Sequence, residues 1–135
     1  MTITLSTVEK LLEYLGAGDS VGAMGLFADS IDWFVPGSAR MPWTGRLTHR
    51  YEVASYLRIK WSHFKPGHSQ VRVIKTIVDG EDAVAVGAFS HELLSNGRRM
   101  EAPFAMHVVV TNGEITRMHL FTDTLALAMA FAYPD

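Results

Sequence analysis

The sequence predicts one α+β domain, with helices gathered on one face of a curved antiparallel sheet. Apolar residues at helical spacing fill most of the first half of the 135-residue chain, whereas the second half holds four β-rich runs. Asp-Gly and Asn-Gly pairs separate these runs, and such pairs are the strongest short-range hairpin signals. A chain of this length buries enough surface to form a core as a single domain over residues 1–135.

Two helices and a strand are expected first. Ser6-Thr7-Val8-Glu9 has the spacing of a capping box and begins a helix that ends at Gly16-Ala17-Gly18. Asp19 caps a short second helix through Phe27. The β-branched and aromatic run Ile31 to Val35 is then a strand, which Pro36-Gly37 ends.

A loop and a third helix complete the first half. Residues 40–47 carry Pro and Gly and are expected to form a loop. Thr48 is a plausible N-cap for a helix with one apolar face, and Lys65-Pro66-Gly67 ends it.

The second half should form a four-stranded antiparallel meander followed by a helix. Asp123 caps this last segment, residues 124–132, which is apolar all round and must be covered by the rest of the protein or by a partner. The expected strands are Val71 to Val78, Ala83 to Leu94, Arg99 to Val110 and Ile115 to Thr122.

Two-residue turns would fix how these strands pair. A turn at Asn112-Gly113 pairs His107 with Met118 and Ala105 with Leu120, and a turn at Asn96-Gly97 pairs Glu101 with Glu92 and His107 with Val86. The sheet face that carries His107 is then expected to line an apolar pocket against the helices. The opposite face is also largely apolar, so it should pack on a second subunit, which predicts a homodimer. This outer face would carry Phe89, His91, Leu93, Ala102, Phe104, Met106, Val108, His119 and Phe121.

Composition excludes several classes of protein. Twelve Lys and Arg against fourteen Asp and Glu leave no basic footprint for nucleic acid. The longest apolar stretch, residues 125–133, is far shorter than the roughly 20 residues of a membrane span. No cysteine is present, and charged residues interrupt residues 1–16, so no secretory signal is recognised and a cytoplasmic location is expected.

The sequence gives no sign of a metal or cofactor site. Its six histidines contain no pair at i,i+2 or i,i+4, the spacings that would place two ligands together. Phosphate-cradling glycine motifs and a nucleophile elbow are also lacking, so we expect neither a metal nor another cofactor.

A series of short motifs runs from the first helix to the last. They are Gly18-Asp19, Leu26-Phe27-Ala28-Asp29, Asp32-Trp33, Val35-Pro36-Gly37, Pro42-Trp43-Thr44-Gly45, Val78-Asp79-Gly80 and Asp123-Thr124-Leu125-Ala126. With them the chain resembles the SnoaL-like and ketosteroid-isomerase-like branch of the nuclear-transport-factor-two-like superfamily. The resemblance implies a cone-shaped α+β barrel, commonly dimeric, with a deep apolar pocket between the sheet and the helices.

The resemblance does not identify one reaction, because the superfamily includes isomerases, cyclases, hydrolases, dehydratases and binding proteins. The three catalytic positions of ketosteroid isomerases fall on Val35, Leu11 and Ala105, which are all apolar, so a typical ketosteroid isomerase is not expected. The last-strand aspartate of limonene-epoxide-type hydrolases falls on Leu120. SnoaL-type cyclases use an acid/base group near the last strand, where His119 and Asp123 are the nearest matches.

Three residues are the candidate catalysts. His107 on the pocket face could act as acid or base near neutral pH, or could be a hydrogen-bonded core histidine. Glu101 opposite Glu92 could hold a proton near the pocket mouth, or could belong to a solvated charge cluster with nearby arginines. Asp32 could assist as a base if it turns toward the pocket rather than to solvent.

Aromatic side chains are the candidate ligand contacts, since aromatic walls suit a flat, mostly apolar molecule. Arg40 and Arg46 flank Trp43 and could bind a ligand carboxylate at the rim. The candidate lining residues are Trp33, Val35, Trp43, Tyr56, Trp61, Val86, Ala105, Met118 and Leu120.

The sequence therefore predicts a cofactor-independent acid/base enzyme of the isomerase, cyclase or dehydratase type. Its substrate would be a small hydrophobic molecule, cyclic or polyketide-like. The alternative is a protein of the same fold that binds a small molecule without catalysis or that serves as a dimerisation module.

Overall fold

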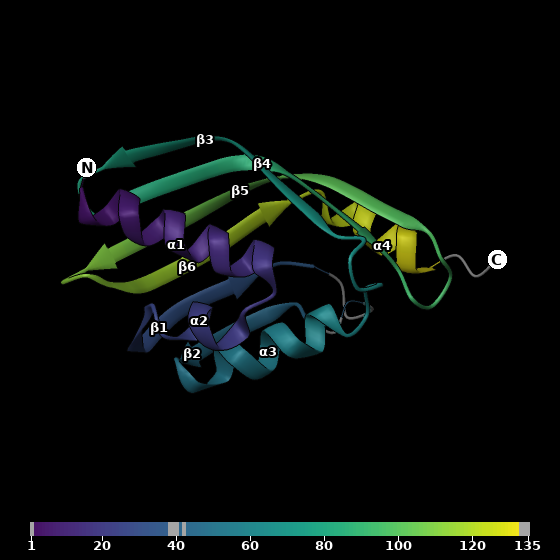
Figure 1. Cartoon of the computed structure of the whole chain (residues 1–135), viewed down its shortest axis with the longest axis horizontal. Coiled ribbons are helices and arrows are strands. Elements are labelled where there is room, and N and C mark those ends of the chain that lie inside the picture. The colour runs from purple at the N-terminus through teal and green to yellow at the C-terminus, as the bar shows by residue number, and fades with distance from the viewer. Residues whose placement is uncertain (1, 38–40, 42, 133–135) are drawn as a thin grey trace.

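The computed structural model describes residues 2–37, 41 and 43–132, with the side chain of Ala132 excepted. These residues form an α+β fold in which helices lie against one sheet (Figure 1). The helices are α1 (Ile3–Ala17), α2 (Ser20–Met24), α3 (Tyr51–Trp61) and α4 (Thr124–Ala132). The strands are β1 (Phe27–Val35), β2 (Gly45–His49), β3 (Gln70–Asp79), β4 (Asp82–Glu92), β5 (Arg99–Thr111) and β6 (Glu114–Thr122).

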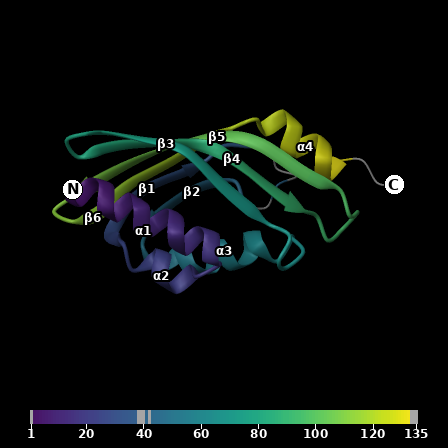
Figure 2. The same cartoon turned by 45° about the horizontal axis from the view of Figure 1, so that its top comes forward.

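The sheet runs in the order β2-β1-β6-β5-β4-β3. The four long strands β3 to β6 form the predicted antiparallel meander. β1 lies parallel to β6, and β2 is an additional edge strand antiparallel to β1, so the sheet is mixed at this side. The sheet is curved and unclosed, with α1, α2 and α3 beneath its arch and α4 at the end away from the N-terminus (Figure 2). This arrangement confirms the predicted fold class.

Several elements begin elsewhere than predicted. α1 starts one turn early because the Thr2 side chain accepts a hydrogen bond from the Leu5 amide at 3.1 Å. Phe27 opens β1 instead of ending α2, since the Ile115 amide donates to the Leu26 carbonyl and brings this segment against β6.

β2 occupies part of the predicted loop and includes Thr48, the expected helix cap. The Glu52 carboxylate accepts from the Thr48 and His49 amides at 3.1 and 3.0 Å, and α3 therefore begins only after Arg50. A strand here depends on pairing with β1, which local sequence patterns do not reveal.

The β5–β6 hairpin has the predicted two-residue turn but an unpredicted bulge. Asn112 and Gly113 both have positive φ, at 52° and 79°, as the turn requires. The register then shifts between Val109 and Val110, where Thr116 is the extra residue on β6. A one-residue shift moves every later side chain of a strand to the opposite face.

The β4–β5 connection is longer than predicted. The Leu93 amide donates to the Arg98 carbonyl at 2.9 Å, so four residues rather than two form the turn. Pairing therefore differs by two positions from the prediction: Glu101 lies opposite Ser90, and Glu92 lies opposite Arg99. A shift of two keeps each side chain on its predicted face, so only β6 changes sides relative to β5.

The structure reverses the predicted roles of the two faces of β4 and β5, because the face with Phe89 and His91 is the one that meets the helices. His107 pairs with Val84 and His119, not with Val86 and Met118, and it lies on the face turned away from α1 and α3. Met118 instead shares the inner face with Met106. The inner face is thus the one that carries Phe89, His91, Ala102, Phe104, Met106, Val108, Met118 and Leu120.

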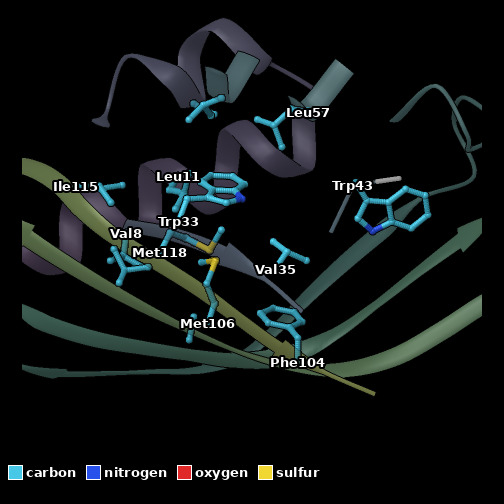
Figure 3. Packing of buried hydrophobic residues seen from close by; sticks show 14 of the residues in the cluster. Val8, Leu11, Trp33, Val35, Trp43, Leu57, Phe104, Met106, Ile115 and Met118 are labelled. Carbon is cyan, nitrogen blue, oxygen red and sulfur yellow. The ribbon is translucent and has the colours of Figure 1, made fainter. Parts of the chain in front are cut away.

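The core fills the space between this inner face and the helices. Figure 3 shows Met106 and Met118 rising from the sheet toward Trp33, with Leu11 and Leu57 coming from the helices. These side chains are fully or almost fully buried. Dense packing of this kind fixes the position of the neighbouring polar groups described below.

α4 is only partly covered. Leu127 is buried and Phe131 packs edge-on against Trp43, but Leu125 and Met129 are exposed. No helix in the described part of the chain has the length and apolarity needed to cross a membrane.

Candidate active site

A cavity of about 120 Å³ lies between the inner sheet face and helices α1 and α3. Its walls are mostly aliphatic and aromatic, which suits an apolar ligand. The lining residues are Leu12, Leu15, Gly16, Trp33, Val35, Leu57, Lys60, Trp61, Ser69, Val71, Phe89, His91, Phe104, Met106, Met118 and Leu120.

His91 is the buried ionisable group of this wall. β4 turns Phe89 and His91 to the same face because alternate residues of a strand share a side. The His91 ring stacks on Phe64, with centroids 4.0 Å apart, and its Nδ1 lies 2.7 Å from the Ser69 hydroxyl oxygen. Burial lowers the pKa of His91 to about 3, with smaller contributions from the charges of Lys60 and Arg99. The imidazole is therefore neutral at physiological pH.

Lys60 is the second ionisable group at the cavity. Leu57, Lys60 and Trp61 stand at i, i+3 and i+4 on α3, so they share the helix face that lines the cavity. Burial lowers the pKa of Lys60 to about 8. Among the residues that the structure describes, no carboxylate lies within ion-pair distance of its amine. A substantial fraction of this amine is consequently neutral at slightly alkaline pH.

A third polar group is the Trp33 indole. Its Nε1 is buried and makes no hydrogen bond of normal geometry with the described residues, although the Tyr56 side chain lies beside the indole and interacts with it. A buried donor without a partner is costly, and a ligand oxygen would satisfy it.

Five of the predicted lining residues border the cavity: Trp33, Val35, Trp61, Met118 and Leu120. Trp43 and Tyr56 do not border the cavity: Trp43 is buried beyond Val35 in Figure 3, and Tyr56 is partly buried behind Trp33.

Trp43 and Tyr56 have a structural role instead. Trp43 packs against Phe64 and Phe131, and its carbonyl accepts a hydrogen bond from the Tyr56 hydroxyl. Burial raises the pKa of Tyr56. Val86 and Ala105 were predicted to line the pocket, but this placement is wrong, because they pair with each other on the outer face of the sheet.

His107 does not reach the cavity. Its Nε2 lies 2.7 Å from the Asp82 carboxylate on the outer face. Glu101 is also on the outer face, exposed and 3.4 Å from Arg99, and the predicted contact with Glu92 is absent because the four-residue turn moves Glu92 opposite Arg99. The predicted pocket positions of His107 and Glu101 are therefore wrong.

Asp32 belongs to a polar network on the outer face. Its carboxylate accepts from His119 Nε2 at 2.9 Å and from Arg117 at 3.1 Å, and Arg46 lies 3.6 Å away. The pKa of Asp32 is lowered, mainly by the hydrogen bond from His119. Burial acts in the opposite direction, and the charges of His119, Arg117 and Arg46 lower the pKa further. Arg117 also lies 3.2 Å from His119 Nδ1, so both ring nitrogens are occupied.

The remaining candidates have simple structural roles. Arg46 stacks over the Phe34 ring at 4.4 Å in addition to its contact with Asp32. Asp123 caps α4 by accepting from the Ala126 amide at 3.0 Å. Arg40 lies outside the described residues. The described residues contain no group of three or more His, Asp or Glu placed to hold a metal ion.

The sequence interpretation missed His91, Lys60 and Ser69 as a group. One signal was available: the face with Phe89 and His91 is the more continuously apolar one, whereas the face assigned to the pocket carries Glu92 and Glu101. That contrast indicates which face meets solvent. Ser69 lies before β3 and reaches His91 only through tertiary contact, so no local pattern points to it.

Comparison with known proteins establishes the family. Residues 8–118 match the family model of the SnoaL-like domain, and the chain belongs to this family. No curated protein matches the chain.

Solved structures show the same fold. An NTF2-like protein of unknown function from Burkholderia pseudomallei superposes with a TM-score of 0.88 at 20% identity, covering 98% of this chain and 100% of the other. A candidate SnoaL-like polyketide cyclase from a Jannaschia species gives 0.83 at 14% identity, covering 98% and 94%. A protein of ketosteroid-isomerase-like fold from Catenulispora acidiphila, in complex with trimethylamine, gives 0.79 at 12% identity, covering 95% and 93%. The suspected superfamily branch is thereby confirmed.

Proposed function

We propose that this protein is a cofactor-independent acid/base enzyme of the isomerase or cyclase type, which acts on a small hydrophobic carbonyl compound. The observation that carries this proposal is the pair Lys60 and His91 in the wall of an otherwise apolar cavity. Ionisable groups with strongly shifted pKa values in a concave apolar site are typical of proton-transfer catalysts. The SnoaL-like family and the candidate cyclase among its structural neighbours support the same class of reaction.

Lys60 is the group suited to exchange the proton. General acid/base catalysis works best when the pKa of the catalyst lies near the working pH. The Lys60 pKa of about 8 meets this condition, whereas the His91 pKa of about 3 makes the imidazole a weak base. In the proposed step the neutral amine removes a proton from the carbon next to the ligand carbonyl.

His91 is suited to stabilise the oxygen of the resulting enolate. In the proposed arrangement the Ser69 hydroxyl donates to Nδ1, which leaves the proton of the neutral ring on Nε2. Nε2 has no hydrogen-bond partner among the described residues and would donate to the ligand oxygen. A neutral imidazole placed in this way polarises a carbonyl without first losing its own proton.

The cavity walls indicate the size and character of the ligand. An engineered cavity of about 150 Å³ in another protein holds one benzene molecule. The present cavity, at about 120 Å³, therefore encloses roughly one ring, and the rest of a larger molecule would extend past its mouth. Trp33, Trp61, Phe89 and Phe104 supply aromatic contacts for such a ring.

A binding protein without catalysis is the second candidate. The resemblance aligns the catalytic positions of ketosteroid isomerases with Val35, Leu11 and Ala105, which carry no ionisable group, and Ala105 lies on the outer face of the sheet. No carboxylate lines the cavity among the described residues. Without catalytic groups, an apolar cavity would still bind a hydrophobic ligand.

Deuterium exchange separates the two candidates. The protein would be incubated in buffered D₂O with 2-indanone, a small ketone with acidic protons beside its carbonyl, and exchange would be followed by proton NMR. We expect acceleration by the wild type, loss of at least tenfold in Lys60→Met and a smaller loss in His91→Asn. Lys65→Met, at an exposed lysine, is the matched control and should exchange at the wild-type rate. Ketone that binds but exchanges no faster than in buffer would exclude the enzyme and favour the binding protein.

We also propose that the outer sheet face joins two copies of this chain. This face carries apolar side chains along β4 and β5, including Val84, Val86 and Ala105, and Phe121 beside them is 51% exposed. A partly exposed apolar patch of this kind on a sheet face favours burial against a partner. The expected cytoplasmic location stays a prediction.

A further inference from the structure

We propose that Lys60 forms a covalent imine with an aldehyde or ketone that enters the cavity between α3 and the inner face of the sheet. This inference rests on the proposed function, because it assigns a chemical route to the same site and the same class of ligand. Proton removal beside a carbonyl is easier after imine formation, since the protonated imine withdraws electrons more strongly than the carbonyl itself.

The surroundings of Lys60 favour imine formation more than the surroundings of the other lysines do. Lys60 borders the cavity, while Lys10, Lys65 and Lys75 are exposed. Lys65 in addition lies 3.5 Å from the Glu92 carboxylate, whereas no ion pair to a described residue holds Lys60 as an ammonium. Only an unprotonated amine attacks a carbonyl, and desolvation in an apolar site is a known way to obtain one.

The step balances without a further reactant. The Lys60 nitrogen lone pair attacks the carbonyl carbon, and a proton passes from nitrogen to oxygen to give a carbinolamine. The hydroxyl group then takes a proton from solvent and leaves as water, and the nitrogen lone pair forms the C=N bond of a protonated imine. A water molecule takes a proton from the neighbouring carbon, and the electrons of that C–H bond form the C=C bond of an enamine while the C=N bond becomes a C–N bond. Return of a proton to this carbon restores the protonated imine, and addition of water to its carbon then releases the carbonyl compound and frees the lysine.

His91 and Ser69 are placed to assist the loss of water. The 2.7 Å contact between His91 Nδ1 and the Ser69 oxygen orients the ring, and both residues border the cavity together with Lys60. A hydrogen bond from Nε2–H to the carbinolamine oxygen would stabilise the departing hydroxyl. These two side chains therefore act as positioning and hydrogen-bonding groups around the covalent step.

Reductive trapping tests the inference. The full chain would be treated at pH 7 with benzaldehyde, which has no proton beside its carbonyl, and with cyanoborohydride to reduce any imine to a stable benzylamine. Peptide mapping by mass spectrometry would then assign each adduct, since α-amino groups also react in this pH range. At this pH an amine of pKa about 8 is unprotonated roughly three hundred times more often than an ordinary lysine. We expect Lys60 to be labelled at least tenfold faster than Lys10, Lys65 or Lys75.

Two variants and a competitor sharpen the result. Lys60→Arg keeps the positive charge but forms no imine, and it should lose the cavity adduct while Lys65→Arg keeps it. Excess toluene, which has a ring but no carbonyl, should slow the labelling of Lys60 and leave the exposed lysines unchanged. Equal labelling of all four lysines, or labelling of Lys60 that toluene does not slow, would overturn the imine.

The deuterium-exchange assay keeps the two proposals distinguishable. Accelerated exchange without a Lys60 adduct overturns the imine and leaves Lys60 as a simple base. A Lys60 adduct without accelerated exchange supports the covalent step and contradicts the proposed proton transfer. Circular dichroism of Lys60→Arg would confirm that its fold matches the wild type before either comparison is made.

Discussion

His107 and His119 lie directly opposite each other on β5 and β6, on the sheet face turned away from α1 and α3. Each ring binds an aspartate: His107 binds Asp82 at 2.7 Å, and His119 binds Asp32 at 2.9 Å. These two pairs explain how an apolar sheet face accommodates polar residues, because each imidazole has a charged hydrogen-bond partner. They also show that His107 is not part of the candidate active site, which lies on the opposite face of the sheet.

Replacement of His107 tests this separation. His107→Gln should leave deuterium exchange of 2-indanone within twofold of the wild type, since the side chain does not reach the cavity. Loss of its hydrogen bond to Asp82 should lower the free energy of unfolding by about 1 kcal/mol or less. Proton NMR of the ketone and urea denaturation would measure the two effects. A tenfold loss of exchange with unchanged stability would return His107 to the active site.

Asp32 should stabilise the fold in a pH-dependent way. Its pKa is lowered in the folded protein, so its carboxylate adds stability above the ordinary value of 3.8 and loses it as the pH falls through the lower folded value. Asp32→Asn should therefore cost about 1 kcal/mol at pH 7, because the side chain is half exposed. The difference from wild type should shrink toward pH 3 in urea denaturation. If the difference in free energy of unfolding between wild type and Asp32→Asn stays constant over this pH range, the charge of Asp32 does not contribute to stability.

The sequence predicts much of this fold because its signals are local. The Asn112-Gly113 turn, the Asp123 cap and the alternation along β4 and β5 each depend on neighbouring residues, and the structure contains all of them. β2 is different, because its five residues form a strand only where β1 offers an edge. Such pairing depends on tertiary context, which overrides local propensity.

The site was harder to predict than the fold because it depends on which sheet face meets the helices and on one inserted residue in β6. The bulge at Thr116 moves Met118 to the inner face and His119 to the outer face. Thr116 is held there by contacts of its hydroxyl with Thr111 and the Val109 carbonyl, at 3.2 and 3.4 Å, which become visible only once the strands are paired. The predicted catalyst His107 was misplaced because the wrong face of β4 and β5 was assigned to the pocket, and the bulge explains only why Met118 and Leu120 do not share that face with it.

A charge on the outer face should separate the proposed dimer. Val86 lies in the middle of β4, opposite Ala105 and Lys75 on the neighbouring strands. We expect wild-type protein to elute with twice the chain mass of 15.0 kDa, and Val86→Arg to elute as a monomer. Val21→Arg places the same charge on an exposed position of α2 and is the control. Light scattering after size exclusion measures both, and a monomeric wild type would refute the interface.

His91 should make the protein sensitive to acid. Its folded pKa of about 3 lies below the ordinary value of 6.5, so the unfolded chain binds an extra proton between these pH values. Stability should consequently fall as the pH drops through this window, by up to about 1.4 kcal/mol per unit. His91→Asn removes this contribution, whereas His49→Asn at an exposed histidine should not. Urea denaturation at several pH values gives the slopes, and equal slopes for wild type and His91→Asn would contradict the buried neutral imidazole.

Gly87 should be required for the close approach of β3 to β4. A Cβ atom at this position would lie 2.1 Å from the Arg72 carbonyl oxygen and 3.0 Å from the Val73 Cα, and backbone atoms cannot swing aside as a side chain does. β3 already changes register between Val73 and Lys75, so the added methyl group would push the strand away. We expect Gly87→Ala to lower the free energy of unfolding by about 2 kcal/mol or more.

Hydrogen exchange would locate the damage of Gly87→Ala. Amides of β3 should exchange faster, while those of β6, which does not pair with β4, should keep their protection relative to global unfolding. Gly25→Ala is the matched control, because Gly25 is not in the cavity wall, its φ of −63° suits alanine, and a Cβ there meets only the Gly22 and Val21 carbonyl oxygens at 3.5 and 3.6 Å. Ser69 directly precedes β3 and holds His91, so a displaced β3 should also weaken binding of the apolar ketone in the cavity. Unchanged stability in Gly87→Ala would mean that the β3 backbone yields freely, and the wall formed by Ser69 and Val71 would then be too mobile to orient His91.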